Sequence, residues 1–259
     1  MVRTGVLIGL VLLSLLSSGQ SAEVDQNTLA KITEVFQTRY QPSGETDSGG
    51  GVQYAVAINV PADQCGDTFS QNFLSQDDSN TVKQELTANH LYQGQHMVAA
   101  TPKGVSSTSK IHSERALLMC AGFNQAVTPV QNLLNKDRGG CVVFYTYNSP
   151  CLEYCLNQTK DENERNRETK QRERAEKKGK PVNVAPAVAK CILNSLSMLS
   201  NHNGPKAFVF SQVYRNDINN PELAAALKKV AEQVPLYKCT TNSCVKCLNN
   251  NEIVNQCLS

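Results

Sequence analysis

The chain has 259 residues, of which 40% are hydrophobic and 19% are charged, and its formal net charge is +2. This length supports one ordinary hydrophobic core. The near-neutral charge excludes a strongly basic or strongly acidic protein, although a local groove on such a protein can still be positive and bind nucleic acid.

The N-terminus has the pattern of a secretory signal peptide. Arg3 provides the positive flank, residues 6–16 form an apolar run, and small residues follow over 17–22. The apolar run is too short to span a bilayer. We therefore predict a signal peptide over residues 1–22 and a secreted mature protein that has no membrane partner after cleavage. An uncleaved membrane anchor is the alternative.

The cysteine count has to be interpreted for an exported protein. In an oxidising compartment most of the 10 cysteines are expected in disulfides. If two of them bind a metal, the other eight can form up to four bridges, whose connectivity the sequence does not define: Cys65, Cys120, Cys141, Cys191, Cys239, Cys244, Cys247 and Cys257. The last of these lie in a cysteine-rich C-terminal tail over 241–259, where we favour disulfides over a metal or redox site.

The first half of the chain predicts one helix and two strands. Apolar residues recur at helical spacing over 25–40, and alternation predicts a strand over 52–60. A polar, loop-like stretch over 62–85 separates this strand from a second one over 97–101, which we expect to pair with it antiparallel. A Ser/Thr-rich loop over 103–111 follows.

The middle of the chain predicts a central strand between helices. A helix is expected directly after His112, and a second one over 128–135 with a proline at its start. The continuous apolar run over 141–147 is typical of a strand buried on both faces. Pro150 then suits the first turn of a new helix and places Cys151 near that helix's N-terminus.

The last part of the chain alternates helices and strands after a charged insertion. Mixed charges over 158–180 predict a solvated helical extension, with a nucleic-acid-binding arm as the alternative. Helices are predicted over 184–200 and 221–233, and strands over 207–214 and 236–240. This alternation implies parallel pairing through right-handed crossovers.

Two short motifs on either side of the central strand carry the chemistry. His112-Ser113-Glu114 precedes that strand, and Ser149-Pro150-Cys151 with Cys155 follows it. One imidazole and two thiols form a set that leaves the fourth zinc position to water, and a nearby carboxylate can move that water's protons. Helix N-termini at His112 and Cys151 would favour thiolates, and Cys155 would lie one helical turn after Cys151.

Together these motifs resemble the signature of the cytidine deaminase superfamily, His-x-Glu followed by Pro-Cys-x(2–4)-Cys, and most closely its AID/APOBEC branch. The resemblance implies an α/β fold over residues 23–240, a three-layer α-β-α sandwich with a mixed five-stranded sheet and added disulfides. It implies that His112, Cys151 and Cys155 are zinc ligands and that Glu114 is the catalytic proton shuttle.

The resemblance also implies a function. By this resemblance the protein is expected to be a secreted zinc-dependent hydrolase that converts cytosine to uracil. Its expected substrate is single-stranded DNA or RNA outside the cell, and its expected role is in defence. Two alternatives stay open at this point. One is a deaminase of free nucleosides or nucleotides, and the other is a catalytically inactive binding protein on the same scaffold, in which Cys151 and Cys155 are joined in a disulfide.

Three features depart from the family pattern. The spacer between Cys151 and Cys155 has three residues, whereas two are commoner. A glycosylation sequon begins at Asn157, beside the second cysteine. The chain has no Trp to stack on bases, so the candidate stacking residues are Tyr147, Tyr154 and Tyr214.

Overall fold

The computed structural model has a mixed seven-stranded sheet at its centre. It describes residues 23–44, 51–66, 68–106, 109–121, 123, 126–179 and 189–259. The predicted signal peptide, residues 1–22, lies outside the described residues. The strands run in the order β2-β3-β1-β6-β7-β8-β9. Their bounds are β1 (Ala55–Val60), β2 (Leu91–Gln93), β3 (Met97–Ala100), β6 (Cys141–Asn148), β7 (Lys206–Gln212), β8 (Leu236–Cys239) and β9 (Cys244–Lys246).

The five predicted strands form the centre of this sheet, and the predicted strand number of five is corrected to seven. β2 and β9 add one strand at each edge. Each has only three residues, too short to show an alternating pattern in the sequence. The predicted pairing is confirmed, because β1 is antiparallel to β3, while β6, β7 and β8 are parallel.

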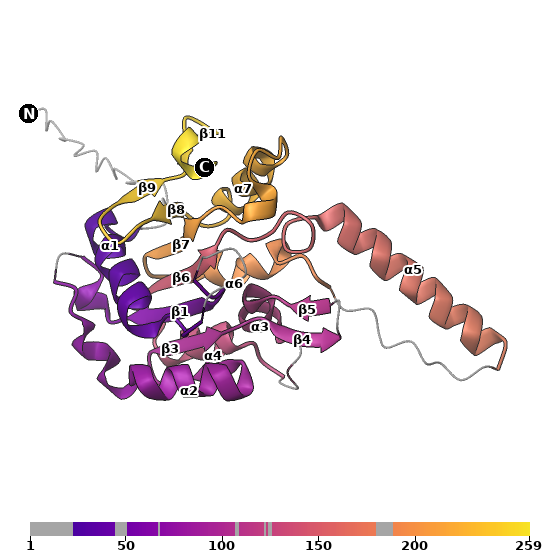
Figure 1. Cartoon of the computed structure of the whole chain (residues 1–259), viewed down its shortest axis with the longest axis horizontal. Coiled ribbons are helices and arrows are strands. Elements are labelled where there is room, and N and C mark those ends of the chain that lie inside the picture. Colours follow the sequence, from indigo (N-terminus) through magenta and orange to yellow (C-terminus); the bar gives the residue numbers. More distant parts are fainter. Residues whose placement is uncertain are drawn as a thin grey trace, which may run out of the picture.

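Helices cover both faces of the sheet, so the molecule has the predicted three layers (Figure 1). Alternate residues of β1 face opposite ways: Val56 and Ile58 pack in one core, and Ala55 and Ala57 in the other. The first core includes α1 (Gln26–Val35), the π-helical turn η1 (Phe36–Tyr40) and α2 (Ser79–Asn89). The second includes α3 (Ser113–Met119), α4 (Pro129–Lys136), α6 (Ser197–Ser200) and α7 (Leu223–Ala231).

Two segments predicted as loops contain regular structure. Residues 62–85 include short 3-10 turns, η2 (Ala62–Gln64) and η3 (Gln71–Gln76), and most of α2. Helix α2 begins at Asp78, whose carboxylate accepts the amide of Thr81 at 3.0 Å. Only Val82 and Leu86 of α2 are buried, so its apolar periodicity is weak. The segment before His112 is a hairpin of β4 (Lys103–Ser106) and β5 (Ser109–Ile111).

The helix predicted over 184–200 is shorter within the described residues. It consists of the 3-10 turn η4 (Leu193–Leu196) followed by α6, and residues 184–188 lie outside the described part. A further 3-10 turn, η5 (Arg215–Asp217), follows β7. None of the described helices is long and apolar enough to cross a membrane.

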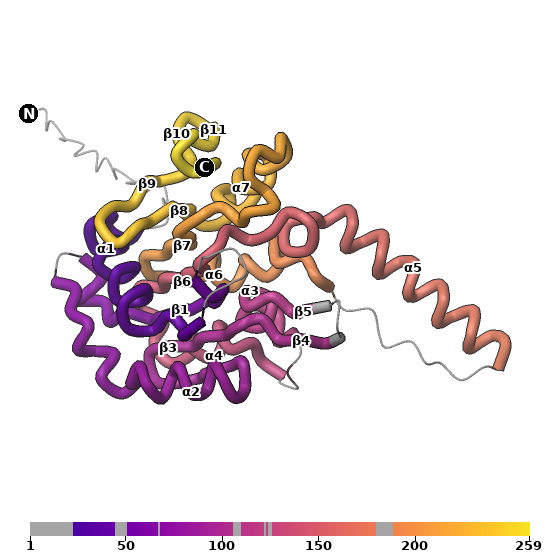
Figure 2. Tube along the Cα trace, in the orientation of Figure 1, coloured from indigo at the N-terminus to yellow at the C-terminus, as the bar shows by residue number. Residues whose placement is uncertain are grey.

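Three disulfides join six of the ten cysteines: Cys65–Cys141, Cys239–Cys244 and Cys247–Cys257. The tail cysteines therefore form disulfides, as predicted, and leave four free thiols: Cys120, Cys151, Cys155 and Cys191. The C-terminal segment continues through β9, the small hairpin of β10 (Leu248–Asn249) and β11 (Glu252–Ile253), and η6 (Asn255–Cys257). It lies beside β8 and α7 (Figure 2).

One helix projects from the body of the molecule. α5 (Gln158–Lys177) extends away from the sheet (Figure 1), and Asp161 is its only buried residue. Lys190 fixes its base, because the Lys190 amide donates to Asp161 at 2.6 Å and its ammonium pairs with Glu164 at 2.5 Å. The predicted solvated helical extension is therefore present over 158–177.

Candidate metal centre

His112 stands at the junction between the β4–β5 hairpin and α3. It has extended backbone angles, and its carbonyl accepts the amide of Ala116 at 3.1 Å, so it is the N-cap residue of α3. The sequence prediction that His112 opens a helix is confirmed. The hairpin on one side and the helix on the other hold the imidazole at the edge of the second core.

Cys151 and Cys155 lie in a turn after β6, which corrects the prediction of a helix starting at Pro150. The amides of Cys155 and Leu156 both donate to the Cys151 carbonyl at 3.1 Å, which makes a single helical turn, and α5 begins only at Gln158. Other elements bond two further backbone groups of this turn. Asp217 accepts the amide of Leu152 at 3.0 Å, and the Cys155 carbonyl accepts the amide of Ile192 at 2.9 Å.

This turn brings the three predicted ligands together. The Nδ1 atom of His112 lies 3.4 Å from Cys151 Sγ and 3.3 Å from Cys155 Sγ, and all three ligand atoms lie within 4.8 Å of one another. In a tetrahedral zinc site the bond lengths place nitrogen and sulfur ligands about 3.6 Å apart. The donor set and its spacing therefore fit zinc, with one position left for water.

Hydrogen bonds within the cluster favour a thiolate. The Cys155 thiol and the His112 ring each form a hydrogen bond with Cys151 Sγ. These hydrogen bonds lower the pKa of the Cys151 thiol to about 4, although burial acts in the opposite direction. The hydrogen bond to Cys151 raises the pKa of His112. The bond to Cys151 and complete burial raise the pKa of Cys155. A site that already holds one thiolate next to an imidazole suits a divalent cation.

Glu114 is buried in the first turn of α3, and three side chains donate to its carboxylate. Thr146 Oγ1 donates to Oε1 at 2.7 Å, Gln53 Nε2 donates to the same oxygen at 3.1 Å, and Ser113 Oγ donates to Oε2 at 3.2 Å. Burial nevertheless raises the pKa of Glu114 above its ordinary value. A carboxylate that is held in place and has a raised pKa is better suited to accept and release a proton than an exposed carboxylate.

Gln53 is the residue at this site that the sequence analysis missed. It precedes β1 and faces the same side as Ala55, and its Nε2 atom also donates to Thr146 at 2.8 Å. The amide and side chain of Asn148 donate to Gln53 Oε1 at 2.9 and 2.8 Å, which fixes the orientation of the Gln53 amide. Its signal was a polar side chain in register with the buried, small-residue face of a strand.

A pocket of about 370 Å³ opens over the cluster. His112, Cys151, Tyr154 and Tyr214 are among its lining residues, and the Tyr154 ring stands edge-on to the His112 ring with 6.0 Å between centroids. Two of the three tyrosines named as stacking candidates thus line the pocket. Tyr147 lies elsewhere and stacks on Tyr54.

The pocket wall carries acidic groups. Glu153, Asp217 and Glu222 line it, and among the described residues only Glu153 is paired with a basic residue, Lys160, at 2.6 Å. Burial raises the pKa of Asp217. Asn157 also lines the pocket. Glycosylation at Asn157 stays a prediction, and a glycan there would lie at the pocket mouth.

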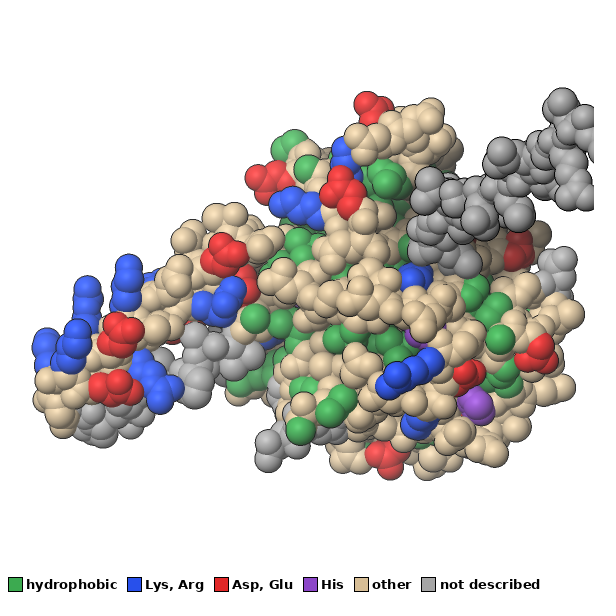
Figure 3. Space-filling view, turned by 180° about the vertical axis from the view of Figure 1, so that it is seen from behind, with side chains coloured by type: hydrophobic (Ala, Val, Ile, Leu, Met, Phe, Trp, Pro, Cys, Tyr) green, Lys and Arg blue, Asp and Glu red, His purple; other side chains and the backbone are tan. Residues whose placement is uncertain are grey.

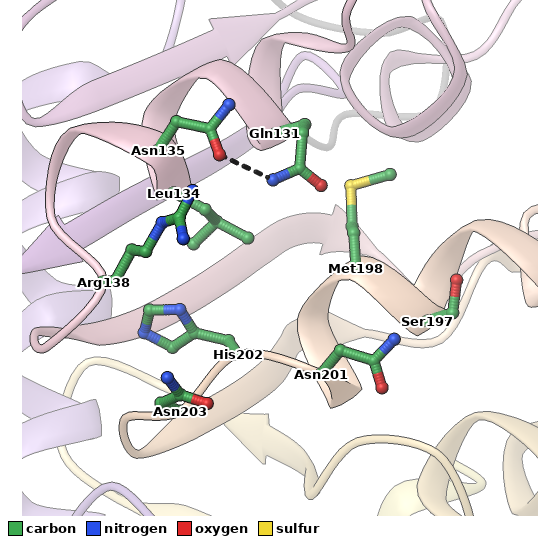
Figure 4. A pocket seen from close by; sticks show the side chains of 9 residues that line it. All are labelled: Gln131, Leu134, Asn135, Arg138, Ser197, Met198, Asn201, His202 and Asn203. Carbon is green, nitrogen blue, oxygen red and sulfur yellow. Dashed lines mark hydrogen bonds between the residues drawn. The ribbon is translucent and has the colours of Figure 1, made fainter.

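A roomier hollow lies between α4 and α6, away from the cluster (Figure 4). It measures about 580 Å³, and amide side chains such as Gln131 and Asn135, joined at 3.1 Å, form much of its wall. None of the described residues that line it is a cysteine or carries a carboxylate. Its histidine, His202, bonds to the Gly140 carbonyl at 2.7 Å, as expected of a structural residue. The smaller pocket over His112 is therefore the better candidate for catalysis.

Comparison with known families decides the family of the chain. The model of the family described as Secreted Novel AID/APOBEC-like Deaminase 1 matches residues 27–171 and 183–259, nearly the whole chain. The chain belongs to this family. No curated protein and no solved structure matches it. The predicted AID/APOBEC-like resemblance is confirmed, and family membership together with the His112, Cys151 and Cys155 cluster supports a hydrolytic deaminase scaffold with a possible metal site.

Proposed function

We propose that the protein is a secreted zinc-dependent deaminase that converts cytosine to uracil in single-stranded DNA or RNA. The observation that carries this proposal is the meeting of one imidazole nitrogen and two free thiols beside a buried, hydrogen-bonded Glu114. Membership of a deaminase family described as secreted supports the reaction class and the location. Secretion would bring the enzyme to nucleic acid outside the cell, including that of a pathogen, which is the basis for proposing a role in defence.

In this proposal three residues hold the metal and a fourth, Glu114, transfers protons. His112 Nδ1, Cys151 Sγ and Cys155 Sγ would hold zinc, which supplies an activated water when bound. Glu114 Oε1 accepts from Gln53 and Thr146, so Oε2 is the oxygen with fewer donors. In this proposal Glu114 takes the two protons of the attacking water in turn and delivers one to the ring nitrogen and the other to the leaving amine. Water and cytosine thereby give uracil and ammonia.

Replacing the proton shuttle tests this assignment. Glu114→Gln keeps the size of the side chain but cannot carry a proton, so we expect deamination of a cytosine-containing oligonucleotide to fall by at least about 10²-fold. Zinc content and melting temperature should stay at their wild-type values. Wild-type turnover by Glu114→Gln would contradict the role of Glu114.

A free nucleoside is the second candidate substrate. Asp217 and Glu222 on the pocket wall disfavour a phosphate inside the pocket and would accept an uncharged nucleoside. The ratio of kcat/KM for cytidine and for an oligonucleotide separates the two. The inactive-binder alternative expects a Cys151–Cys155 disulfide, whereas the structure has both as free thiols.

A further inference from the structure

The projecting helix α5 carries a basic stripe. Arg167, Lys170, Arg174 and Lys177 follow one another at spacings of three, four and three residues. An α-helix has about 3.6 residues per turn, so these four side chains share one face over about 15 Å of helix axis. Lys and Arg side chains gather towards the free end of α5 in the space-filling view (Figure 3).

The stripe is exposed, and it gathers basic residues on one face of a helix that has seven basic and six acidic residues in all. All four side chains are exposed, and within the described part of the chain none of them forms an ion pair. The other two arginines of α5 each form an ion pair: Arg165 pairs with Asp161 at 3.3 Å, and Arg172 pairs with Glu176 at 3.1 Å. By helical spacing the acidic residues lie on the flanks and the opposite face: Asp161, Glu162, Glu164, Glu168, Glu173 and Glu176.

The stripe is continuous with the candidate active site. Asn157, the N-cap of α5, lines the pocket over His112 and also a second hollow of about 440 Å³. This second hollow is also lined by Arg167, the first residue of the stripe, and by Thr159, Lys160, Asn163 and Glu164, the last of which is paired with Lys190. A chain leaving the pocket along α5 therefore passes from one hollow to the next and onto the basic face.

The two sides of the pocket differ in charge, and this difference favours one path for a polyanion that leaves the pocket. The wall formed by Asp217 and Glu222 is acidic, whereas the side formed by α5 leads to four basic residues. Phosphates would be repelled by the first and bound by the second. We propose that the α5 stripe binds the phosphate backbone of a single-stranded nucleic acid whose cytosine occupies the pocket. This inference rests on the proposed function for the identity of the polyanion.

Salt-dependent binding tests the stripe directly. The quadruple variant Arg167→Gln, Lys170→Gln, Arg174→Gln and Lys177→Gln keeps good helix formers in α5. The probe is a fluorescent single strand of about 30 nucleotides with one cytosine, titrated between about 50 and 200 mM salt. Glu114→Gln is present in every protein, so binding is measured without turnover. Thr159→Ala is also present and removes the sequon at Asn157.

We expect the quadruple variant to bind at least about tenfold more weakly at low salt, with a salt slope smaller by about 0.7 for each phosphate that the variant no longer neutralises. The matched control removes four exposed or half-exposed charges from the body, Lys31→Gln, Lys83→Gln, Arg138→Gln and Lys229→Gln, and should bind as the parent does. Equal binding and equal slopes for the parent and the quadruple variant would overturn the proposal.

Two further outcomes separate this inference from the proposed function. If the quadruple variant binds a heparin oligosaccharide more weakly but binds the oligonucleotide as the parent does, the stripe serves a sulfated polysaccharide and the inference is wrong. If the wild-type protein deaminates free cytidine while oligonucleotide binding does not depend on the stripe, the inference fails and the deaminase assignment stands. Weaker oligonucleotide binding with unchanged melting temperature supports the inference whatever the turnover assay shows.

Discussion

At the scale of single residues, the side-chain amide of Gln53 helps to position the Glu114 carboxylate. Gln53 donates to Glu114 and to Thr146, which itself donates to Glu114, and Asn148 fixes the Gln53 carbonyl oxygen. Replacing this amide removes one hydrogen-bond donor from Glu114 and one from Thr146 together. Gln53 therefore acts as a positioning residue for the proposed shuttle.

Gln53→Ala tests this role. We expect kcat to fall by about 10- to 100-fold, because a displaced catalytic group no longer has its near-attack geometry. KM, zinc content and melting temperature should change little. Gln37→Ala is the control, since Gln37 is also a glutamine with side-chain hydrogen bonds, to Tyr145 and Ser211, but on the other face of the sheet. A purely structural Gln53 would instead lower the melting temperature with kcat unchanged.

At the scale of elements, the turn carrying Cys151 and Cys155 shows how tertiary contacts override a local preference. Pro150 suits a helix start, and the cysteine spacing suits one helical turn. The turn forms, but the helix does not continue, because the Cys155 carbonyl accepts the amide of Ile192 instead of an amide one turn further along the chain. Asp217 accepts the amide of Leu152, a first-turn donor that a helix would also leave unpaired. The ligand spacing was therefore predictable from the sequence, and the backbone around it was not.

The disulfides provide an element-scale prediction. Cys65–Cys141 closes a loop of 76 residues, and Cys239–Cys244 closes one of 5. Loop-closure entropy predicts a loss of about 4 kcal/mol for Cys65→Ala with Cys141→Ala, and about 2 kcal/mol for Cys239→Ala with Cys244→Ala. Urea denaturation measures both. Equal losses, or a larger loss for the short loop, would contradict the entropic account.

At the scale of the whole molecule, the sequence predicts what depends on long, regular patterns. The buried run of β6, the alternation of β1 and the parallel pairing of β7 with β8 all follow from apolar periodicity and element order. The short edge strands β2 and β9 leave no such pattern, since three residues cannot establish a period.

Contacts between segments that are distant in the chain could not be predicted from the sequence either. Gln53 and Glu114 are 61 positions apart, and only the pairing of β1 with β6 brings Gln53 next to Thr146 and Asn148. The motif residues His112, Cys151 and Cys155 were found because their types and order carry chemistry by themselves. The signal of Gln53, a polar side chain in register with the buried face of a strand, is too weak to identify a functional residue, because an amide near a strand start is common.

The zinc content of protein purified from a secreting host tests the central claim most directly. We expect about one zinc per chain in the wild type and in Cys120→Ser, which removes a free thiol outside the cluster. Cys151→Ser should lose the metal, because it removes one of three ligands. A wild-type protein without zinc, with Cys151 and Cys155 joined in a disulfide by peptide mapping, would contradict the deaminase account and favour a binding protein on the same scaffold.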